Sequence, residues 1–298
     1  RHPACPSVEH VQSFIEWRRD VHGNTRRTLK GKLNRLNQAY EFWQADSSLP
    51  HPEGYNPFTL AKEMTDLGSD PDKEFHDLSL ADLRDKFAEI QNIKRRAIIG
   101  LMLKLGPRAG EVCNIQIQDI NISHRELQEV YPDLGSHPAV KNCRNAIYIP
   151  HDRDGNKSWN PRLLPLDEEL RWLLLRYLFI REQVDEPWVF LSNRFTQMKT
   201  KGVNKEWKNE FHPKFAETDE KRAITSHFGR HWFSSHWRLN AGLEREHVQY
   251  MRGDSVQPID DFPDAIDDYL HPHYEHIEME YRNNIFKLNL PMRHSISQ

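Results

Sequence analysis

Apolar residues recur at three- and four-residue steps along the first part of the chain, a pattern that predicts helices with one buried face. A first helix is expected after Ser7, whose hydroxyl can cap the helix start. A shorter helix is expected over residues 59–64, and residues 68–72 have the composition of a linker. Between these lies a longer helix with an apolar face of Leu29, Leu33, Leu36, Tyr40 and Trp43.

The second part of the chain predicts further helices and one β-hairpin. Ser79, with Asp82 three residues later, is typical of a capping box. Short β-prone runs at 146–150 and 162–166 flank a polar stretch, which predicts a hairpin with a long turn. The other expected elements are an apolar helix over 96–105, a helix over 170–181 and an extended piece over 188–191.

These patterns predict a fold that is mainly α with a small β-sheet (α+β) and two domains. We expect a helical N-terminal domain over residues 1–68, a linker over 69–76 and a second domain over 77–298.

Composition argues against a membrane-spanning protein and against a disulfide scaffold. Charged residues make up 29% and hydrophobic residues 37% of the 298 positions, and no apolar run approaches the length of a bilayer span. The three cysteines lack CxxC spacing, and an odd number of thiols suits a reducing compartment. We therefore expect a soluble, cytoplasmic protein.

A basic run near the N-terminus contrasts with the net charge of -3. A single acid, Asp20, accompanies seven basic residues there: Arg18, Arg19, Arg26, Arg27, Lys30, Lys32 and Arg35. Because binding to a phosphate backbone depends on the local field of the contact face, this run is a candidate DNA-binding surface. A solvated helix face without a ligand is the alternative interpretation.

Two arginines have settings suited to a phosphate. Forked guanidinium donors match phosphate geometry and stabilise the charge that develops when a phosphodiester breaks. Arg108 follows an apolar helix and a Gly-Pro turn, which predicts a buried bend, and Glu111 is close enough to orient it. Arg230 lies three residues after His227, so the two side chains would share one helix face.

The segments around these arginines resemble two signature boxes of the tyrosine recombinase (phage integrase) family. The Arg108 segment is similar to the first-arginine box, and residues 227–230 are similar to the HxxR box. By the same resemblance Lys157, five residues before Arg162, is the hairpin lysine that protonates the leaving 5′ oxygen of DNA.

Residues 264–269 resemble the segment that presents the nucleophilic tyrosine in archaeal members of the family, which assigns Tyr269 as the nucleophile. A phenol with a pKa of about 10 is a poor nucleophile at neutral pH, so it needs neighbouring cations and a proton acceptor. Tyr274 and Tyr281 are the competing tyrosines.

One position departs from the family pattern. Members commonly carry His or Trp between the second arginine and the tyrosine, whereas this chain has Asp254. An ionised carboxylate accepts hydrogen bonds and cannot donate them. Asp254 is therefore expected either to orient an arginine or to leave the donor role to Arg252. The stretch 255–263 lengthens the usual gap to the tyrosine, which indicates an inserted loop.

The resemblance implies a DNA breaking and rejoining enzyme that uses a 3′-phosphotyrosyl intermediate and no metal or other cofactor. It implies a core-binding N-terminal domain, a catalytic C-terminal domain, double-stranded DNA as partner, a homodimer or homotetramer on DNA, and association with the nucleoid. In such enzymes the tail, here residues 278–290, docks on a neighbouring protomer, and packing on its own core is the alternative.

Three other functions remain open. A catalytically inactive relative would keep the fold and bind DNA, and a type IB-like topoisomerase would share the chemistry. A metalloenzyme is suggested by two groups of histidines, namely His271, His273 and His276, and His227, His231 and His236. Pro272 interrupts the first group and the second lacks the glutamate of an HExxH site, which favours the recombinase.

Overall fold

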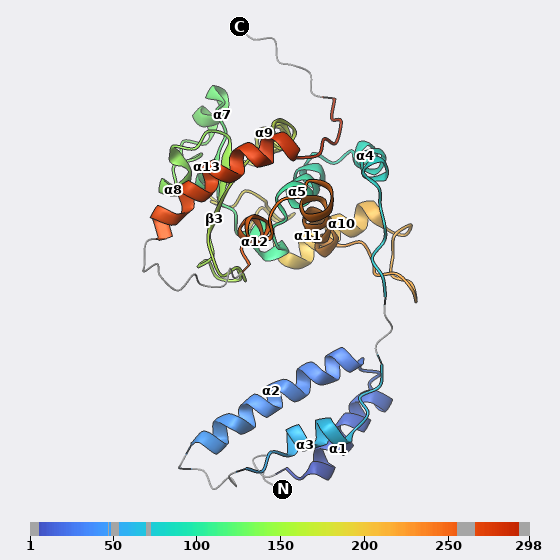
Figure 1. Cartoon of the computed structure of the whole chain (residues 1–298). Coiled ribbons are helices and arrows are strands. Elements are labelled where there is room, and N and C mark those ends of the chain that lie inside the picture. Colours follow the sequence, from blue (N-terminus) through green and yellow to red (C-terminus); the bar gives the residue numbers. More distant parts are fainter. Residues whose placement is uncertain (1–5, 47, 49–53, 70–72, 255–265, 292–298) are drawn as a thin grey trace. The chain divides into compact units, whose positions relative to one another are not determined.

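The computed structural model of the chain describes residues 6–46, 48, 54–69, 73–254 and 266–291, and of residues 266–273 it describes the backbone alone. The chain divides into two compact units, Arg1–Lys73 and Glu74–Gln298. Each unit has its own hydrophobic core. The fold is mainly helical with a small sheet, as the sequence predicts (Figure 1).

The first unit is a group of short and long helices: α1 (Val8–Glu16), the π-helical turn η1 (Trp17–Val21), α2 (Arg26–Ala45) and α3 (Pro57–Met64). Side-chain caps set their starts, because Ser7, Thr25 and Asn56 each accept a hydrogen bond from a first-turn amide. The core of this unit is built from Val11, Ile15, Leu29, Leu33, Tyr40, Phe58, Ala61 and Leu67.

The apolar face of α2 is narrower than the sequence predicts. Leu29, Leu33 and Tyr40 are buried, whereas Leu36 is 39% exposed. Leu36 lies to one side of the line through the buried positions, and two short helices do not cover the whole apolar face of a long one. The expectation of a buried Leu36 is therefore wrong.

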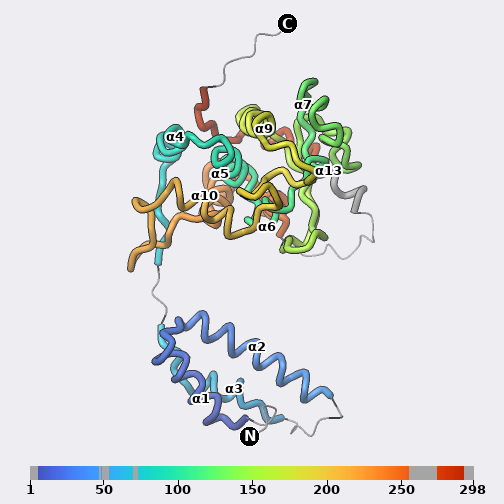
Figure 2. Tube along the Cα trace, turned by 180° about the vertical axis from the view of Figure 1, so that it is seen from behind, coloured from blue at the N-terminus to red at the C-terminus, as the bar shows by residue number. Residues whose placement is uncertain are grey.

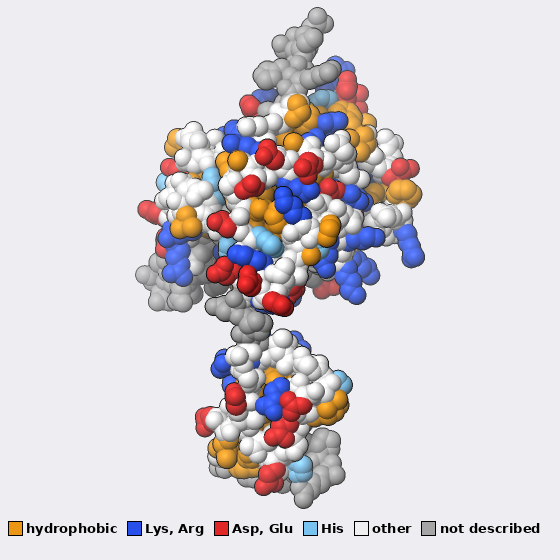
Figure 3. Space-filling model, turned by 90° about the vertical axis from the view of Figure 1, so that its right-hand side faces the viewer, with side chains coloured by type: hydrophobic (Ala, Val, Ile, Leu, Met, Phe, Trp, Pro, Cys, Tyr) orange, Lys and Arg blue, Asp and Glu red, His pale blue; other side chains and the backbone are white. Residues whose placement is uncertain are grey.

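The basic run spans two elements. Arg26, Arg27, Lys30 and Arg35 lie exposed on α2. Arg18 and Arg19 lie on η1 with local partners: Arg18 donates to Asn24, and Arg19 pairs with Asp20. On the faces of both units drawn in Figure 3, basic side chains are interspersed with acidic ones.

The second unit is organised around helix α5 (Ile93–Leu105), whose residues 97–105 are all buried. Helices α9 (Glu168–Ile180) and α11 (Ser226–Ser235) pack against it. A helix with no exposed face after its first turn needs neighbours on every side. The tube in Figure 2 shows α5 enclosed among helices of the unit.

The sheet consists of three antiparallel strands in the order β1 (Ile120–Asn121), β2 (Ala146–Ile149) and β3 (Arg162–Pro165). Strands β2 and β3 form the predicted hairpin, with Ile147 opposite Leu164 and Ile149 opposite Arg162. The two-residue strand β1 was not predicted, because it is too short to show an alternating pattern. Helix α13 (Ile266–Asn284) packs along β3 (Figure 1).

The remaining elements complete the layers around α5 and the sheet. They are α4 (Leu80–Glu89), α6 (Ala109–Asn114), η2 (Ile117–Asp119), α7 (Arg125–Val130), α8 (Pro138–Lys141), α10 (Thr200–Phe211), η3 (His236–Asn240) and α12 (Arg245–Arg252). The predicted capping box of Ser79 and Asp82 opens α4. Among the described residues, none of the helices has the length and apolar character needed to span a membrane.

The segment after α13 packs on the core of its own unit. The apolar residues Ile285, Phe286, Leu288 and Leu290 are buried there. The Glu169 carboxylate accepts the amides of Leu288 at 2.7 Å and Leu290 at 3.1 Å. Of the two arrangements expected for the tail, the structure has the intramolecular one.

Candidate functional site

Arg108 is positioned by the end of helix α5. The helix stops at Gly106, which has a φ of +64°, a backbone conformation that favours glycine. The chain then turns through buried Pro107, and Arg108 becomes the N-cap of α6. The bend is buried, as predicted, but the Arg108 side chain itself is 30% exposed.

Glu111 is a buried carboxylate that ties Arg108 to the sheet. Its oxygens accept the Arg108 amide at 2.7 Å and Arg162 Nη2 at 2.5 Å, and the Ser158 hydroxyl also donates to it. Burial opposes ionisation of Glu111, but the charge of Arg162 and these hydrogen bonds outweigh burial and lower its pKa to about 2. Glu111 is therefore an anion that pairs chiefly with fully buried Arg162 and only weakly, at 3.4 Å, with the guanidinium of Arg108.

Arg230, on helix α11, points into the same region. Its Nη1 donates to the carbonyls of Gly106 at 2.8 Å and Arg252 at 3.0 Å, and its Nη2 donates to Asp254 at 2.6 Å. Only 6% of its side chain is exposed. Burial, followed by the nearby charge of Arg108, lowers the pKa of Arg230 to about 9, although Asp254 opposes this shift.

Asp254 brings three arginines together. Its Oδ1 accepts Arg108 Nη2 at 2.8 Å and Arg230 Nη2 at 2.6 Å. Its Oδ2 lies 2.8 Å from Arg252 Nε, an ion pair without the alignment of a hydrogen bond. We call Arg108, Arg230 and Arg252 the arginine cluster. Residues 146 positions apart, Arg108 and Asp254, thus meet at one point.

The loop between β2 and β3, residues 150–161, is fastened beside this cluster. Asn114 of α6 donates to the Asp154 carbonyl and the Asn156 side chain, both at 2.8 Å. Ser158 of the loop accepts a hydrogen bond from Arg108 at 3.1 Å. Lys157 lies between these anchors, exposed, and its ammonium has no ion-pair partner within the described residues.

His227 lies in the first turn of α11, with part of its side chain open to solvent and part covered by neighbouring residues. Partial burial and the charges of Arg230 and other neighbours lower the pKa of His227, so its imidazole is neutral at neutral pH. The ring of Phe75 lies 6.5 Å from that of His227 and stacks on that of His231 at 4.1 Å. His236 faces a different region, with Nε2 3.1 Å from the Asn284 carbonyl.

The histidine group of α11 therefore does not converge on one point. Within the part of the chain that is described, no group of three or more His, Cys, Asp and Glu residues is arranged to hold a metal ion. The side chains of His271 and His273 lie outside the described residues.

The three candidate tyrosines all lie on helix α13. Tyr274 and Tyr281 are 4% and 1% exposed, and burial raises the pKa of both phenols well above the usual value. The Tyr281 hydroxyl also donates to the Lys104 carbonyl. The backbone of Tyr269 belongs to the first turn of α13, and its side chain lies outside the described residues.

Three residues of the site were missed as participants at the level of sequence. Arg162 served only as a landmark for Lys157, Ser158 was not considered, and Arg252 was named only as a substitute donor. The sequence does carry a signal for Arg162, because it lies within an apolar strand. An arginine buried in such a strand needs a buried acid as its partner, and here that acid is Glu111.

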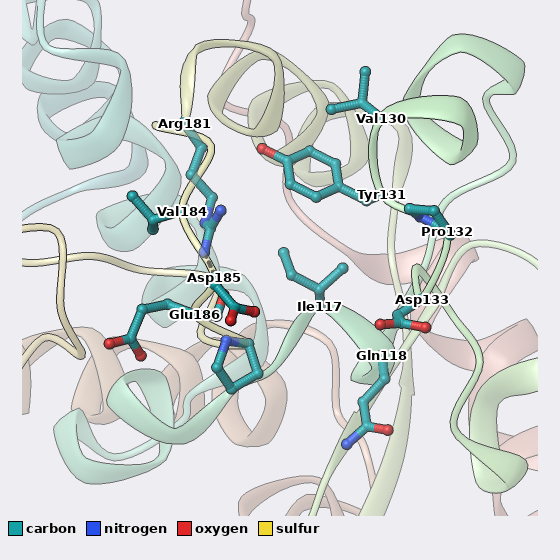
Figure 4. A pocket seen from close by; sticks show the side chains of 11 residues that line it. Ile117, Gln118, Val130, Tyr131, Pro132, Asp133, Arg181, Val184, Asp185 and Glu186 are labelled. Atoms are coloured by element: carbon teal, nitrogen blue, oxygen red, sulfur yellow. Dashed lines mark hydrogen bonds between the residues drawn. The ribbon is translucent and has the colours of Figure 1, made fainter.

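A pocket of about 350 Å³ lies elsewhere in the second unit and contains none of the candidate residues (Figure 4). Its lining is Ile117, Gln118, Val130, Tyr131, Pro132, Asp133, Arg181, Val184, Asp185, Glu186 and Pro187. Arg181 donates to the carbonyls of Glu182, Glu186, Trp188 and Val189. Its guanidinium therefore holds the loop after α9 together.

The sequence pattern of the phage integrase family matches residues 78–255. The chain belongs to the phage integrase family. Members of this family, the tyrosine recombinases, break and rejoin DNA. The matched range includes Arg108, Lys157, His227, Arg230 and Asp254, and Tyr269 lies beyond it.

Solved structures of phage integrase family proteins share the fold. A Tn1549 transposon integrase in complex with transposon right-end DNA is 18% identical, with a TM-score of 0.61 over 94% of this chain and 86% of that one. A lambda integrase dimer bound to a COC′ core site is 13% identical, with a TM-score of 0.57 over 88% of this chain and 83% of that one. Lambda integrase also matches as a tetramer bound to a Holliday junction, at 12% identity and a TM-score of 0.57, over 87% of this chain and 67% of that one. Among curated proteins, no sequence matches this chain.

Proposed function

We propose that this member of the phage integrase family is a site-specific DNA recombinase that cleaves and rejoins strands through a covalent 3′-phosphotyrosyl intermediate on Tyr269. The observation that carries the proposal is the convergence of Arg108 and Arg230 on one carboxylate oxygen, at 2.8 and 2.6 Å. Two guanidiniums that share one oxygen of a carboxylate can share one oxygen of a phosphodiester.

In the cleavage step the Tyr269 oxygen attacks the phosphorus and the bond from phosphorus to the 5′ oxygen breaks. The tyrosyl proton passes to an acceptor, for which neutral His227 is the candidate. Lys157 gives a proton to the leaving 5′ oxygen, so that a 5′-hydroxyl is released. Arg108 and Arg230 stabilise the negative charge on the non-bridging oxygens throughout. Attack of a 5′-hydroxyl on the phosphotyrosine reverses the step and rejoins a strand.

The assignment of Tyr269 rests on its helix as well as on its motif. Tyr274 and Tyr281 on the same helix have buried hydroxyls and raised pKa values, so neither phenol is available to a DNA phosphate in this arrangement. Tyr269 lies in the first turn of α13, five residues before Tyr274.

Double-stranded DNA is the proposed partner, bound in part by the exposed basic residues of α2. Arg26, Lys30 and Arg35 lie within the first three turns of that helix, and their attraction to phosphates would weaken with salt. Trp159 on the β2–β3 loop is 74% exposed and offers an aromatic face to nucleotides. We also propose assembly as a homodimer or homotetramer on DNA, since lambda integrase matches in both forms.

The proposal is tested with a pool of nicked duplexes of random sequence, in which cleavage releases a short fragment and traps the covalent adduct. We expect adducts that survive denaturation in detergent and form in the presence of a metal chelator. Tyr269→Phe should abolish them while DNA binding persists. Tyr281→Phe, the control on the same helix, should retain them. A protein that binds the pool but never forms an adduct is a non-catalytic relative.

A further inference from the structure

The arginine cluster already holds an anion that belongs to the chain itself. Arg108 caps α6, and Arg230 and Arg252 come from α11 and α12. Among the described residues, the carboxylate that all three approach within 2.8 Å is that of Asp254. Glu111, a second acid that pairs with Arg108 in the described part of the chain, is engaged with Arg162, Ser158 and the Arg108 amide. Asp254 is therefore the counterion of this cluster.

A carboxylate resembles the reacting part of a phosphodiester in the features that guanidiniums recognise. Each presents two equivalent oxygens and a single negative charge, and both match forked N–H donors. The Asp254 carboxylate uses one oxygen for two guanidiniums and the other for the third. A phosphodiester entering the same space would meet the same three cations.

The cluster can be reached from solvent on the Asp254 side. The side chains of Arg108, Arg252 and Asp254 are 30%, 32% and 24% exposed, whereas that of Arg230 is 6% exposed. An external anion can therefore approach the Asp254 carboxylate without opening the hydrophobic core. Arg230 is the most deeply buried of the three arginines.

Backbone hydrogen bonds anchor the chain up to Asp254, so a rotation of the side chain is enough to move its carboxylate while Gly253 and the Asp254 amide stay in place. The Gly253 amide donates to the Tyr250 carbonyl at 2.8 Å, and the Asp254 amide donates to the Gln249 carbonyl at 3.0 Å. The Gly253 carbonyl accepts the Trp159 amide of the β2–β3 loop at 3.2 Å.

We propose that Asp254 is an internal occupant of the phosphate site, a carboxylate that the scissile phosphate of DNA displaces from Arg108, Arg230 and Arg252. This inference rests on the proposed function. It gives Arg252 the place of a third cation around the phosphate. In the empty enzyme a tethered anion then offsets one of the three positive charges of the cluster. A DNA phosphate must compete with that anion, so the apparent affinity is reduced by the fraction of time that the site is filled.

The first test uses inorganic phosphate and no DNA. Asp254→Ala vacates the site, and Asp254→Asn keeps the side-chain shape without the charge. Asp152→Ala, which removes an exposed carboxylate from the β2–β3 loop, is the matched control. Phosphate is added at about ten times its dissociation constant for the Asp254→Ala variant. We expect it to raise the melting temperature of this variant by about 3 °C or more above the rise that the same phosphate concentration causes in the wild type and in Asp152→Ala.

The second test measures binding to a duplex that has been captured as a substrate, in a Tyr269→Phe background. We expect Asp254→Ala and Asp254→Asn to bind about tenfold more tightly than the parent, and Asp152→Ala to bind as the parent does. Phosphate stabilisation no larger than that of the control, or weaker DNA binding by both Asp254 variants, would overturn the inference in favour of a purely positioning carboxylate.

The two proposals fail in different ways. The phosphate titration needs neither cleavage nor DNA, so it can succeed for a protein that never forms an adduct. The converse result is that Tyr269 forms adducts while phosphate stabilises the Asp254 variants no more than the control. That result would support the proposed recombinase function and refute the proposal that Asp254 occupies the phosphate site.

Discussion

Glu111 shows how one buried carboxylate sets the geometry of a cationic site. It is 1% exposed and lies between the Arg108 amide and the Arg162 guanidinium. A buried ion pair of this kind is strongly destabilising when one partner is removed, because the other charge is left unpaired. If the Glu111 carboxylate is removed, the Arg162 guanidinium is left buried without an ion-pair partner within the residues that the structure describes.

We expect Glu111→Gln to lower the free energy of unfolding by on the order of 3 kcal/mol at pH 7, as the pKa change from 4.5 to about 2 implies. A lowered pKa in the folded state gives stability above the unfolded-state pKa, and this stability is lost as the pH falls from about 4.5 towards 2. Urea unfolding at pH 7 and pH 3 checks this. The difference in the free energy of unfolding between wild type and variant should be smaller at pH 3 than at pH 7. An equal difference at both pH values would refute the lowered pKa of Glu111.

Gly253 is required by both its backbone and its neighbours. Its φ is +62°, and a Cβ there would clash with Arg162 Nη1 and lie 2.9 Å from Ser158 Oγ. Gly242 offers a matched comparison, with a φ of +67° and nothing within 4 Å of a Cβ.

We expect Gly242→Ala to cost about 1–2 kcal/mol in the free energy of unfolding from backbone strain alone. Gly253→Ala should cost more and should also slow formation of the covalent adduct, because a methyl group displaces Arg162 and Ser158 from Arg108 and Glu111. Unfolding and adduct formation of the two variants are compared side by side. Equal behaviour of the two variants would show that the contact with Arg162 is unimportant.

At the scale of elements, the β2–β3 loop depends on helix α6 for its position. Asn114 holds two points of the loop, and Arg153 of the loop pairs with buried Asp119 of η2. The loop thereby holds Ser158 against Arg108, and its neighbour in the chain, Lys157, is exposed.

We expect Asn114→Ala to slow adduct formation by about tenfold or more, because misplacing a reacting group by even 1 Å costs rate, while DNA binding changes little. Asn121→Ala is the control, since Asn121 also donates to two carbonyls, but to those of Val140 and Lys141 in α8. Single-turnover adduct formation provides the measurement. Equal slowing by the two variants would indicate general loosening of the fold.

Most helices were predictable from the sequence because caps and periodicity are local. Ser79 with Asp82 and the β2–β3 hairpin are cases in which a local signal was sufficient. Strand β1 has two residues and forms only because β2 is beside it. The exposure of Leu36 likewise depends on how few helices surround α2, which periodicity does not report.

The sequence predicted which residues belong to the candidate site better than it predicted the contacts between them. Order and spacing brought Arg108 and Arg230 together with Lys157 as one hypothesis. The sequence indicates that Arg162 needs a buried acid and that Asp254 can orient an arginine. It does not identify Glu111 as the partner of Arg162 or show that Asp254 bridges three arginines, because these contacts join residues far apart in the chain. The side chain of Tyr269 lies outside the described residues, and its role remains a prediction.

At the scale of the second unit as a whole, a buried charge network attaches the C-terminal segment. Lys104 is fully buried and donates to Asp167 at 2.6 Å, to Glu169 at 2.9 Å and to the Phe286 carbonyl at 3.1 Å. Glu169 in turn accepts the amides of Leu288 and Leu290. One lysine thus connects α5 and α9 with the tail.

We expect Lys104→Met to lower the free energy of unfolding by about 3–5 kcal/mol, because it leaves Glu169 buried without its cation and leaves Asp167 with only the longer 3.5 Å pair to Lys287. Lys86→Met, which breaks the more exposed pair with Glu89, should cost no more than about 1 kcal/mol. Hydrogen exchange should show the amides of Leu288 and Leu290 losing protection in the first variant only. Unchanged protection would show that the network does not hold the tail.

The most direct test of the whole account is to identify the amino acid that becomes attached to DNA. The adduct trapped on a nicked duplex is digested with trypsin and nuclease, and the peptide that keeps a nucleotide is sequenced by mass spectrometry. The account predicts a phosphotyrosyl bond at Tyr269. Attachment at Tyr274, Tyr281 or any other residue would contradict it.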